Sequence, residues 1–575
     1  MATLLTEVNS VLGVEIGSIE TRAVLFDVVE ESYQFIAAGS APSTCASPVF
    51  DATVGVIEAI ERLQEITGRF LLDLHKRLII PSHGGVEGVD KLVLTLSCGP
   101  DLDAVTFALF NDISLETVRR LARTVPLNVI EEFGINDRRP TQNQMDALLA
   151  ARPRIVLFAG GSDRGATRSV ARMANMIAST LVLLPKSDRP EVLYCGNHAM
   201  AKRVQEIIER VAEVHITGNV RPEIESEEIG NASFDLNQLI VSERMRSING
   251  LELMTPLCSD QPILTGTSMQ RIIQFLGKQY DPLQGVLGID LGSTRTTAAF
   301  ANHETCRLST LPLGTGIGLE KVLSKVTAAE IEKWLAEPIP QSRIMEYLWQ
   351  KTLFPNSQPV TAEDLAIELA LARQILSMTM DDLAEIGMVN TRSFEPILVG
   401  GPTLTHATDP SQVLLTLLDG IQPTGITPLI LDKHGILAML GAAARINPLM
   451  PIQVLESSAF INLATVITLE SNASPNTAIL EARLRTQSGR HHECTIKQGS
   501  LVSMPLAFGE PGLLYLKPLK KLGIADTVIT EEPVKVRGGV CGLVFDARGR
   551  PLRLPLDEAL RRQTLQKWAT LGREQ

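Results

Sequence analysis

The chain has 575 residues, enough for about three or four domains, and its 45% hydrophobic content can supply several cores. A formal net charge of -12 and a pI near 5.4 argue against nucleic acid or an anionic membrane as a partner. We find no signal-like start and no run of the roughly eighteen apolar residues that a membrane span needs. With seven scattered cysteines and no CxxC pair, we expect a cytoplasmic protein with reduced thiols.

One phrase occurs twice in this sequence. VLGVEIGSIETRA begins at Val11 and VLGIDLGSTRTTA begins at Val286, and in each an apolar strand ends in an acid before a Gly-Ser turn. Such a turn directs backbone N–H groups and hydroxyls at one point, which suits a phosphate. The acid, Glu15 or Asp290, can then hold a Mg²⁺ that neutralises the phosphate. Two hairpins in matched register therefore predict a duplicated architecture around a nucleotide.

Strand and helix signals alternate between the two hairpins. Lys91–Leu96 is a short apolar strand in the first part of the chain. We expect this part, residues 1–150, to form a first lobe. Three further strands follow, at 154–159, 192–195 and 214–217, and helical segments separate them. Strands with helices of that length between them predict an inserted parallel βα unit of three layers over residues 151–260.

The predicted secondary structure changes twice in the second half of the chain. A mostly helical segment follows the second hairpin, and an apolar strand then runs into Gly400 and Gly401, so we expect a second lobe over 261–450. Its stretch from His434 to Pro448 is rich in Gly and Ala and predicts a closely packed helix. Alternating runs with Gly and Pro turns predict a β-rich C-terminal domain over 451–575. Trp568, on its terminal helix, is either an interface anchor or part of the chain's own core.

Two other groups of residues could form a binding site or be ordinary surface residues. Arg164, Arg168 and Arg172 share one face of a predicted helix, which is either an anion site or a solvated basic surface. The run His491–Cys494 contains metal-ligand residue types, but neighbours on a strand face opposite sides, which argues against a metal site. We find no Ser-His-Asp order and no Walker signature, so hydrolase or P-loop chemistry is not indicated.

The order of hairpin, hairpin, strand–Gly–Gly and Gly/Ala helix resembles the superfamily of actin, heat-shock chaperones and sugar kinases. This resemblance implies an α/β fold of duplicated actin-like (ribonuclease H-like) lobes that bind ATP or ADP with Mg²⁺. It gives Asp290 a catalytic role and makes Glu15 and Asp290 metal ligands. The nucleotide-binding residues that it implies are Gly17, Ser18 and Thr21 in the first phosphate loop, Gly292, Ser293 and Thr294 in the second, and Gly400, Gly401 and Pro402 in the adenosine motif.

Four stretches are similar to the glutamate mutase MutL family, which is unrelated to the mismatch-repair protein of that name. They are FAGGSDRGATRSVARMANMIA from Phe158, VLYCGNHAMAKRVQEII from Val192, ITGNVRPEI from Ile216 and VFDARGRPLRLP from Val544. Members of this family are regarded as companions of cobalamin-dependent carbon-skeleton mutases. The resemblance implies an ATP-driven chaperone or reactivating factor with a mutase subunit as partner.

Because the sequence departs from these patterns at several positions, it leaves open whether the protein hydrolyses ATP. Glu15 stands where the first loop usually has Asp, and one more methylene moves a carboxylate by about an ångström, enough to disturb octahedral Mg²⁺ geometry. A longer acid could equally pair with a neighbouring Arg. Arg164 replaces a Gly of the family pattern, and the segment from Leu311 lacks the expected acids. Three functions stay open: a reactivating factor with slow Mg²⁺-dependent ATPase activity, a pseudo-ATPase scaffold or self-associating filament protein, and a small-molecule kinase.

Overall fold

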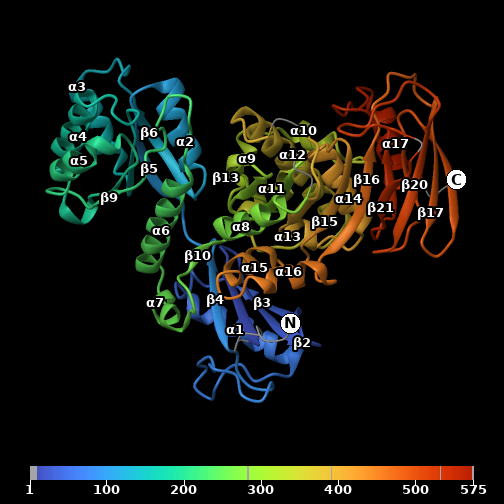
Figure 1. The fold of residues 1–575 in the computed structure, drawn as a ribbon, viewed down its shortest axis with the longest axis horizontal. Helices are drawn as coiled ribbons and strands as arrows, with labels where there is room; N and C mark the ends of the chain where they lie inside the picture. The colour runs from blue at the N-terminus through green and yellow to red at the C-terminus, as the bar shows by residue number, and fades with distance from the viewer. Residues whose placement is uncertain (1–8, 281–283, 390–391, 531, 573–575) are drawn as a thin grey trace. The chain divides into compact units, whose positions relative to one another are not determined.

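The computed structural model describes residues 9–280, 284–389, 392–530 and 532–572. The chain forms two compact units, of which one comprises Met1–Ser97 with Met254–Gln575 and the other comprises Cys98–Leu253 (Figure 1). The second unit is therefore an insertion into the first. The boundary expected at residue 151 falls inside this unit, at the end of helix α3 (Thr141–Ala151).

The first lobe is built on a five-stranded sheet with the order β10-β4-β1-β2-β3. Its strands are β1 (Ser10–Ile16), β2 (Glu20–Val29), β3 (Ser32–Pro42), β4 (Lys91–Leu96) and β10 (Ile263–Leu264). The first three form an antiparallel meander, β4 pairs parallel with β1, and β10 pairs parallel with β4. Helix α1 (Ala52–Thr67) connects β3 to β4, and α8 (Thr265–Gly277) follows β10. The inserted unit thus lies in the chain between the fourth and fifth strands of this sheet.

The second lobe repeats this topology, in the order β13-β12-β11-β14-β15. The strands are β11 (Val286–Leu291), β12 (Thr296–Ala301), β13 (Cys306–Leu311), β14 (Ile397–Gly400) and β15 (Ile426–Leu431). Three antiparallel strands are again followed by two parallel ones. The repeated order confirms the duplicated, actin-like fold that the two sequence phrases predicted.

Helices cover the second lobe and connect the two sheets. They are α9 (Leu319–Leu323), α10 (Ala328–Glu332), α11 (Gln341–Leu353), α12 (Ala362–Glu385), α13 (Pro402–Thr405), α14 (Pro410–Gly420), α15 (Leu437–Ala443) and α16 (Leu449–Glu456). Helix α15 packs on α8, where a Cβ at Gly441 would lie 1.9 Å from the carbonyl oxygen of Ser268. The Ser268 hydroxyl donates to the carbonyl of Ala438 across the same contact. The Gly/Ala stretch therefore forms the close helix contact that the sequence predicted.

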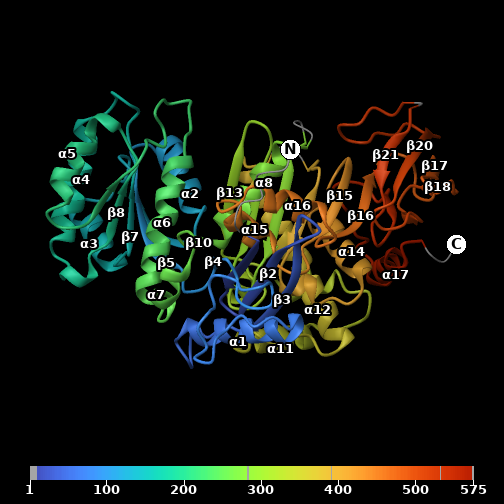
Figure 2. The same ribbon diagram turned by 60° about the horizontal axis from the view of Figure 1, so that its bottom comes forward.

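The inserted unit is a parallel three-layer structure, as the alternating pattern predicted. Its sheet has the order β6-β5-β7-β8-β9, and every pair is parallel. The elements are β5 (Leu102–Phe107), β6 (Leu127–Phe133), β7 (Ile155–Phe158), β8 (Glu191–Tyr194), β9 (Val214–Ile216), α2 (Glu116–Ala122), α4 (Arg168–Leu181), α5 (Ala201–Ile208), α6 (Gly230–Ser247) and α7 (Leu251–Met254). Figure 2 shows α3, α4 and α5 on one side of this sheet and α2 and α6 on the other. Short turns of π- or 3-10 helix in this unit are η1 (Asn111–Leu115), η2 (Lys186–Asp188) and η3 (His198–Met200), while η4 (Thr255–Leu257) follows it in the chain.

The C-terminal segment is β-rich, but it shares a sheet with the second lobe. Strands β16 (Ile461–Thr468), β22 (Leu543–Asp546) and β19 (Leu501–Met504) extend that sheet beyond β15. A separate antiparallel sheet contains β18 (His491–Lys497), β17 (Ala478–Thr486), β20 (Pro511–Pro518) and β21 (Val534–Arg537), in that order. The expected boundary at residue 451 lies within α16.

The terminal helix α17 (Glu558–Ala569) packs on its own chain. Trp568 is buried, its indole N–H donates to the carbonyl of Gly499 at 3.2 Å, and the Arg548 guanidinium lies over its ring. The interface-anchor hypothesis for this residue is therefore wrong, and the core alternative holds. The helices in the described part of the chain include none long and apolar enough to cross a membrane.

Candidate functional site

The two predicted phosphate loops are turns of the same local geometry. The Gly17 N–H donates to the carbonyl of Glu20 at 3.0 Å, and the Gly292 N–H donates to the carbonyl of Arg295 at 3.1 Å. A Cβ at Gly17 would lie 2.5 Å from that oxygen, and one at Gly292 would lie 2.6 Å from its counterpart. Glycine is required in both turns because no side chain fits between the two strands there.

The hydroxyl residues of the loops divide into paired and unpaired groups. Ser18 donates to the carbonyl of Ser97 at 3.1 Å, and Ser293 accepts from the N–H of Ile317 at 3.2 Å. The hydroxyls of Thr21 and Thr294 are buried and have no hydrogen-bond partner within the described ranges. A buried hydroxyl without a partner is costly. These two atoms are therefore the unsatisfied polar groups of the loops.

A glycine-rich segment after β13 holds the second loop in place. The N–H of Thr315 donates to the carbonyl of Gly292 at 3.1 Å, while Gly316 and Gly318 both donate to the carbonyl of Ser293, at 3.0 and 2.9 Å. This is the segment that lacks the acids of the family pattern. Its observed role is to fix the loop through backbone hydrogen bonds.

The predicted adenosine motif lies beside the second loop. Gly400 ends β14 and pairs with Asp290 of β11, and a Cβ at Gly400 would lie 3.6 Å from the Asp290 carboxylate. Gly401 has a φ of +114°, and a Cβ there would lie 2.2 Å from the carbonyl of Leu291, so only glycine fits. Pro402 then begins α13. The strand pairing thus brings Gly400 next to the acid that was predicted to hold Mg²⁺.

Three partly or fully buried carboxylates from both lobes meet near Arg22. Glu15 lies near the end of β1, Asp290 near the end of β11 and Asp432 directly after β15; we refer to them as the carboxylate cluster. Arg22 faces Glu15 across the β1–β2 pair, with 3.6 Å between Nη1 and Oε2. Its other nitrogen is 2.6 Å from Glu20 Oε2. Glu15 therefore does pair with a neighbouring Arg, one of the two roles that the sequence left open.

The turn after β15 fits around the same guanidinium. A Cβ at Gly435 would lie 1.8 Å from Arg22 Nη1, so Arg22 rests directly on the backbone of this turn. Asp432 accepts from the N–H groups of Ile436 and Leu437 at 3.0 and 2.8 Å, which fixes the start of α15. Burial raises the pKa of Asp432, although these two hydrogen bonds and Arg22 oppose the rise.

The other two carboxylates also resist ionisation. Burial raises the pKa of Glu15 to about 7; Arg22 opposes this rise, and the charges of Asp290 and Glu20 add to it. Burial raises the pKa of Asp290 to about 6; again Arg22 opposes the rise and Asp432 adds to it. The cluster holds more negative charge than Arg22 balances, and oxygen ligands are what Mg²⁺ prefers. The donor type of these residues therefore suits a divalent cation.

Sequence reasoning missed Arg22 and Asp432. A signal was present for Arg22, because the second phrase has Thr297 at the equivalent place and the repeat breaks there. Asp432 precedes the Gly/Ala stretch as an acid at a helix start, which is a cap signal. Its proximity to Arg22 depends on contact between the two lobes, which a local pattern does not encode.

The family motifs of the inserted unit lie at the carboxyl ends of β7, β8 and β9. Asp163 Oδ1 accepts from the His198 N–H at 2.9 Å and from Asn219 Nδ2 at 3.0 Å, so the three loops are joined by hydrogen bonds. Arg164 has a φ of +63°, in the region that favours the glycine it replaces. The predicted helix face is wrong for Arg164, which lies in the turn before α4 (Arg168–Leu181), so only Arg168 and Arg172 share that face. All three are exposed, and both an anion site and a solvated basic surface stay open.

Comparisons with known proteins agree with these motifs. A family model described as MutL protein matches residues 11–459. Protein MutL of Clostridium tetanomorphum is 21% identical over 501 residues, covering 78% of this chain and 98% of that protein. Among solved structures, a diol dehydratase-reactivating factor in nucleotide-free form is 10% identical over 76% of this chain and 99% of that chain, with a TM-score of 0.31. Xylulose kinase from Bifidobacterium adolescentis is 13% identical over 77% and 93%, with a TM-score of 0.28. Such low scores do not establish a shared fold, which rests on the strand order instead. Since the family model covers most of its length, the chain belongs to the MutL family that its sequence motifs indicated.

Proposed function

We propose that this chain is a nucleotide-binding chaperone or reactivating factor for a cobalamin-dependent carbon-skeleton mutase of the glutamate mutase type. The nucleotide part is supported by the presence, in one compact unit, of two equivalent turns, the Gly400–Gly401 motif and the carboxylate cluster. Family membership motivates the mutase partner. ATP or ADP with Mg²⁺ is the proposed ligand.

In this proposal each group of the site has its own task. Asp290 and Glu15 hold Mg²⁺, and the bound ion supplies charge neutralisation for the phosphates. The turns at Gly17–Ser18 and Gly292–Thr294 offer backbone N–H groups to the same phosphates. Gly400–Pro402 leave room for the nucleoside because two glycines precede the helix.

The two acids are not equivalent in their surroundings. Glu15 forms an ion pair with Arg22, whereas Asp290 lies beside Gly400, where a Cβ would be in ordinary van der Waals contact with its carboxylate at 3.6 Å. We therefore assign the main metal-binding and catalytic role to Asp290. A slow ATPase is consistent with one displaced ligand, because Mg²⁺ demands near-ideal octahedral geometry.

Reactivation of a purified mutase tests this proposal. A glutamate mutase-type enzyme that carries an inactive cobalamin is mixed with this protein, intact cobalamin and Mg-ATP. We expect turnover to recover with the wild type, and to stay lost with Asp290→Asn or without ATP. Glu304→Gln, an exposed acid on the β12–β13 turn, is the matched control and should behave as wild type. Recovery that is independent of ATP, or no recovery with the wild type, contradicts the proposal.

A second candidate is the pseudo-ATPase scaffold, and the Arg22–Glu15 pair favours it. An arginine that already occupies one side of the cluster competes with a cation for Glu15. A scaffold would bind nucleotide without turning it over and would change its self-association on binding. Light scattering and phosphate release, measured together in the apo, ADP and ATP states, separate the two candidates.

A further inference from the structure

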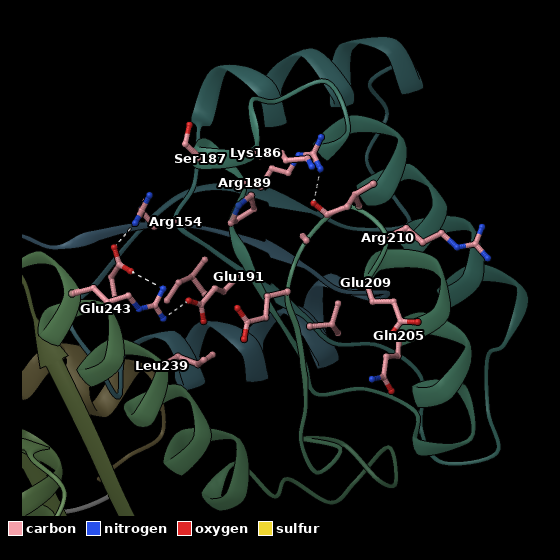
Figure 3. A pocket seen from close by; sticks show the side chains of 17 residues that line it. Arg154, Lys186, Ser187, Arg189, Glu191, Gln205, Glu209, Arg210, Leu239 and Glu243 are labelled. Carbon is pink, nitrogen blue, oxygen red and sulfur yellow. Dashed lines mark hydrogen bonds and ion pairs between the residues drawn. The ribbon is translucent and has the colours of Figure 1, made fainter.

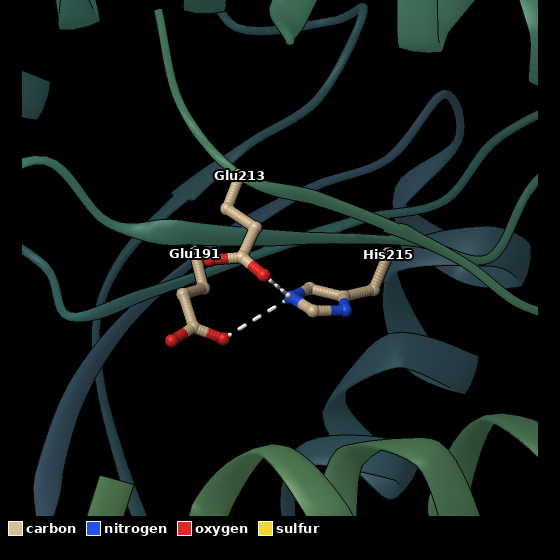
Figure 4. Close-up of side chains that lie close together, drawn as sticks. All are labelled: Glu191, Glu213 and His215. Atoms are coloured by element: carbon tan, nitrogen blue, oxygen red, sulfur yellow. Dashed lines mark hydrogen bonds and ion pairs between the residues drawn. The ribbon is translucent and has the colours of Figure 1, made fainter. Parts of the chain in front are cut away.

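A cluster of one imidazole and two carboxylates lies in the inserted unit, at the opposite end of the sheet from the family loops. Glu191 begins β8, Glu213 immediately precedes β9, and His215 lies within β9. One ligand atom from each residue lies within 4.8 Å of the others. Figure 4 shows both carboxylates directed at the imidazole, with His215 Nε2 at 3.1 Å from Glu191 Oε2 and 3.7 Å from Glu213 Oε1.

The sheet itself sets this arrangement. Val192 pairs with Val214, which places Glu191 beside Glu213 at the amino ends of two parallel strands. The N–H of Val192 donates to the carbonyl of Glu213 at 2.9 Å. His215 follows Glu213 by two positions and shares its face, since side chains alternate along a strand. Regular strand pairing therefore brings all three side chains together.

The distances suit a small divalent cation. A tetrahedral ion with bonds of about 2.0–2.2 Å to nitrogen and oxygen separates its ligand atoms by roughly 3.4 Å. The two observed distances, 3.1 and 3.7 Å, lie on either side of that value. Imidazole with carboxylates is a donor set for Zn²⁺ and similar first-row ions rather than for Mg²⁺ or Ca²⁺.

A chain of ion pairs orients Glu191. Its Oε1 accepts from Arg246 at 2.7 Å, Arg246 lies 3.7 Å from Glu243, and Glu243 pairs with Arg154 (Figure 3). These contacts occupy one oxygen of Glu191 and leave the other directed at His215. Outer partners of this kind are what fix a ligand in a metal site.

The cluster opens into a cleft of about 680 Å³, which Glu191 and Glu213 help to line. Lys186, Arg189 and Arg210 also line it. The two carboxylates together carry a charge of −2, which the ion pair of Glu191 with Arg246 offsets only in part. The cleft is lined by five basic and four acidic side chains and is nearly neutral, so water can complete the coordination of a divalent cation there.

We propose that Glu191, Glu213 and His215 form a binding site for a divalent cation of the zinc type. The site is separate from the proposed nucleotide site, so an experiment can confirm or refute it independently of the proposed function. His215 Nε2 is the nitrogen ligand, and one oxygen from each glutamate completes the protein donor set.

Metal titration of the full-length protein tests this site. Protein stripped with a chelator and kept in excess Mg²⁺ is titrated with Zn²⁺ by calorimetry and with Co²⁺ by visible absorption. We expect a single tight Zn²⁺ site and a Co²⁺ spectrum of low coordination number. His215→Gln and Glu213→Gln should each weaken Zn²⁺ binding by about tenfold or more, since even the loss of a partner outside the ligand set lowers metal affinity by about 10–100-fold.

Two control variants keep the test specific. His198→Gln removes an exposed imidazole at the other end of the same sheet, and Glu209→Gln removes an acid that lines the same cleft. Both should bind Zn²⁺ as the wild type does. The side-chain nitrogen resonances of His215 in the wild-type protein give a second readout, which does not depend on whether a variant folds. Zn²⁺ should shift Nε2, and a spectrum unchanged by Zn²⁺, or equal affinity in His215→Gln and wild type, overturns the proposal.

Discussion

Among single residues, Arg22 has the greatest influence on the charge balance of the carboxylate cluster. It contacts Glu15 and Glu20, it rests on Gly435, and its charge opposes the raised pKa values of Glu15 and Asp290. Arg22 thus stabilises in the free protein the same carboxylates that are proposed to hold Mg²⁺. A cation from solution and Arg22 should therefore compete for Glu15.

Arg22→Met tests this competition. Without Mg²⁺ the variant should lose about 1.5–3 kcal/mol of stability, because Glu20 loses its charged hydrogen-bond donor and Glu15 loses its ion-pair partner. Added Mg²⁺ should then raise its melting temperature more than that of the wild type. Arg62→Met, which breaks an exposed pair with Glu58, is the control and should cost less than about 1 kcal/mol. An equal response of Arg22→Met and wild type to Mg²⁺ would show that the arginine does not compete.

Residues whose role depends on local conformation could be predicted from the sequence. Gly17 and Gly292 were identified because turns of this kind admit no side chain, and the structure confirms the close contacts at both. Gly401 was identified through the family resemblance, and a Cβ there would clash as well. Asp432 could not be assigned to the cluster, because its neighbours Glu15 and Asp290 come from distant parts of the chain. Long-range electrostatic contacts leave no periodic signal in a sequence.

Among the elements, the stretch VFDARGRPLRLP is explained by a buried ion-pair network. Arg548 is buried between Asp546 at the end of β22 and Asp419 of α14, at 2.9 and 2.7 Å. Arg550 also pairs with Asp546, and Arg373 of α12 pairs with Asp419, both at 2.8 Å. The motif therefore fastens the C-terminal strand to two helices of the second lobe.

Asp546→Asn should be strongly destabilising, because it leaves two arginines facing a neutral side chain in the interior. Loss of one partner of a buried pair costs about 3–5 kcal/mol. Urea unfolding measures the change. Glu481→Gln removes an exposed pair with Lys517 in the same segment and should cost less than about 1 kcal/mol. Similar losses in both variants would contradict a special role for the network.

The same network gives stability a definite pH dependence. Burial alone would raise the pKa of Asp546, but the charges of Arg548 and Arg550 outweigh it and hold that pKa well below its usual range. A carboxylate with a lowered folded-state pKa stabilises the fold above its unfolded value, roughly 3.9, and this contribution is lost as the pH falls below it. The stability difference between wild type and Asp546→Asn should therefore shrink as the pH is lowered from about 5.

The sequence predicted that a segment is a strand more reliably than it predicted which other strands that segment pairs with. Alternating runs predicted a β-rich C-terminal domain, yet three of its strands, β16, β19 and β22, belong to the sheet of the second lobe. In the same way the residues of β5 and β6 lie within the range 1–150 that was expected for the first lobe, although they belong to the inserted unit. A two-residue period shows that a segment is extended, but it does not show which strand it pairs with.

For the whole molecule, the domain layout separates the two proposed sites. The nucleotide residues all lie in the unit formed by Met1–Ser97 and Met254–Gln575, and the zinc-type site lies in Cys98–Leu253. Nucleotide and Zn²⁺ should then stabilise different units directly. This separation is testable, because local opening reports the stability of each part of a chain on its own.

Hydrogen exchange with Mg-ADP is the measurement that uses this separation. Ligand at ~100 times its Kd adds ~2.7 kcal/mol to the unit that binds it. We expect slower exchange in the β1–β2 and β11–β12 turns and around Gly401, with little direct change in Cys98–Leu253. Asp290→Asn should remove this protection, whereas Glu304→Gln should keep it. Unchanged exchange at both turns would argue against a nucleotide site there. Protection confined to Cys98–Leu253 would instead place the nucleotide in the inserted unit, where the exposed arginines at 164, 168 and 172 would then be the first residues to substitute.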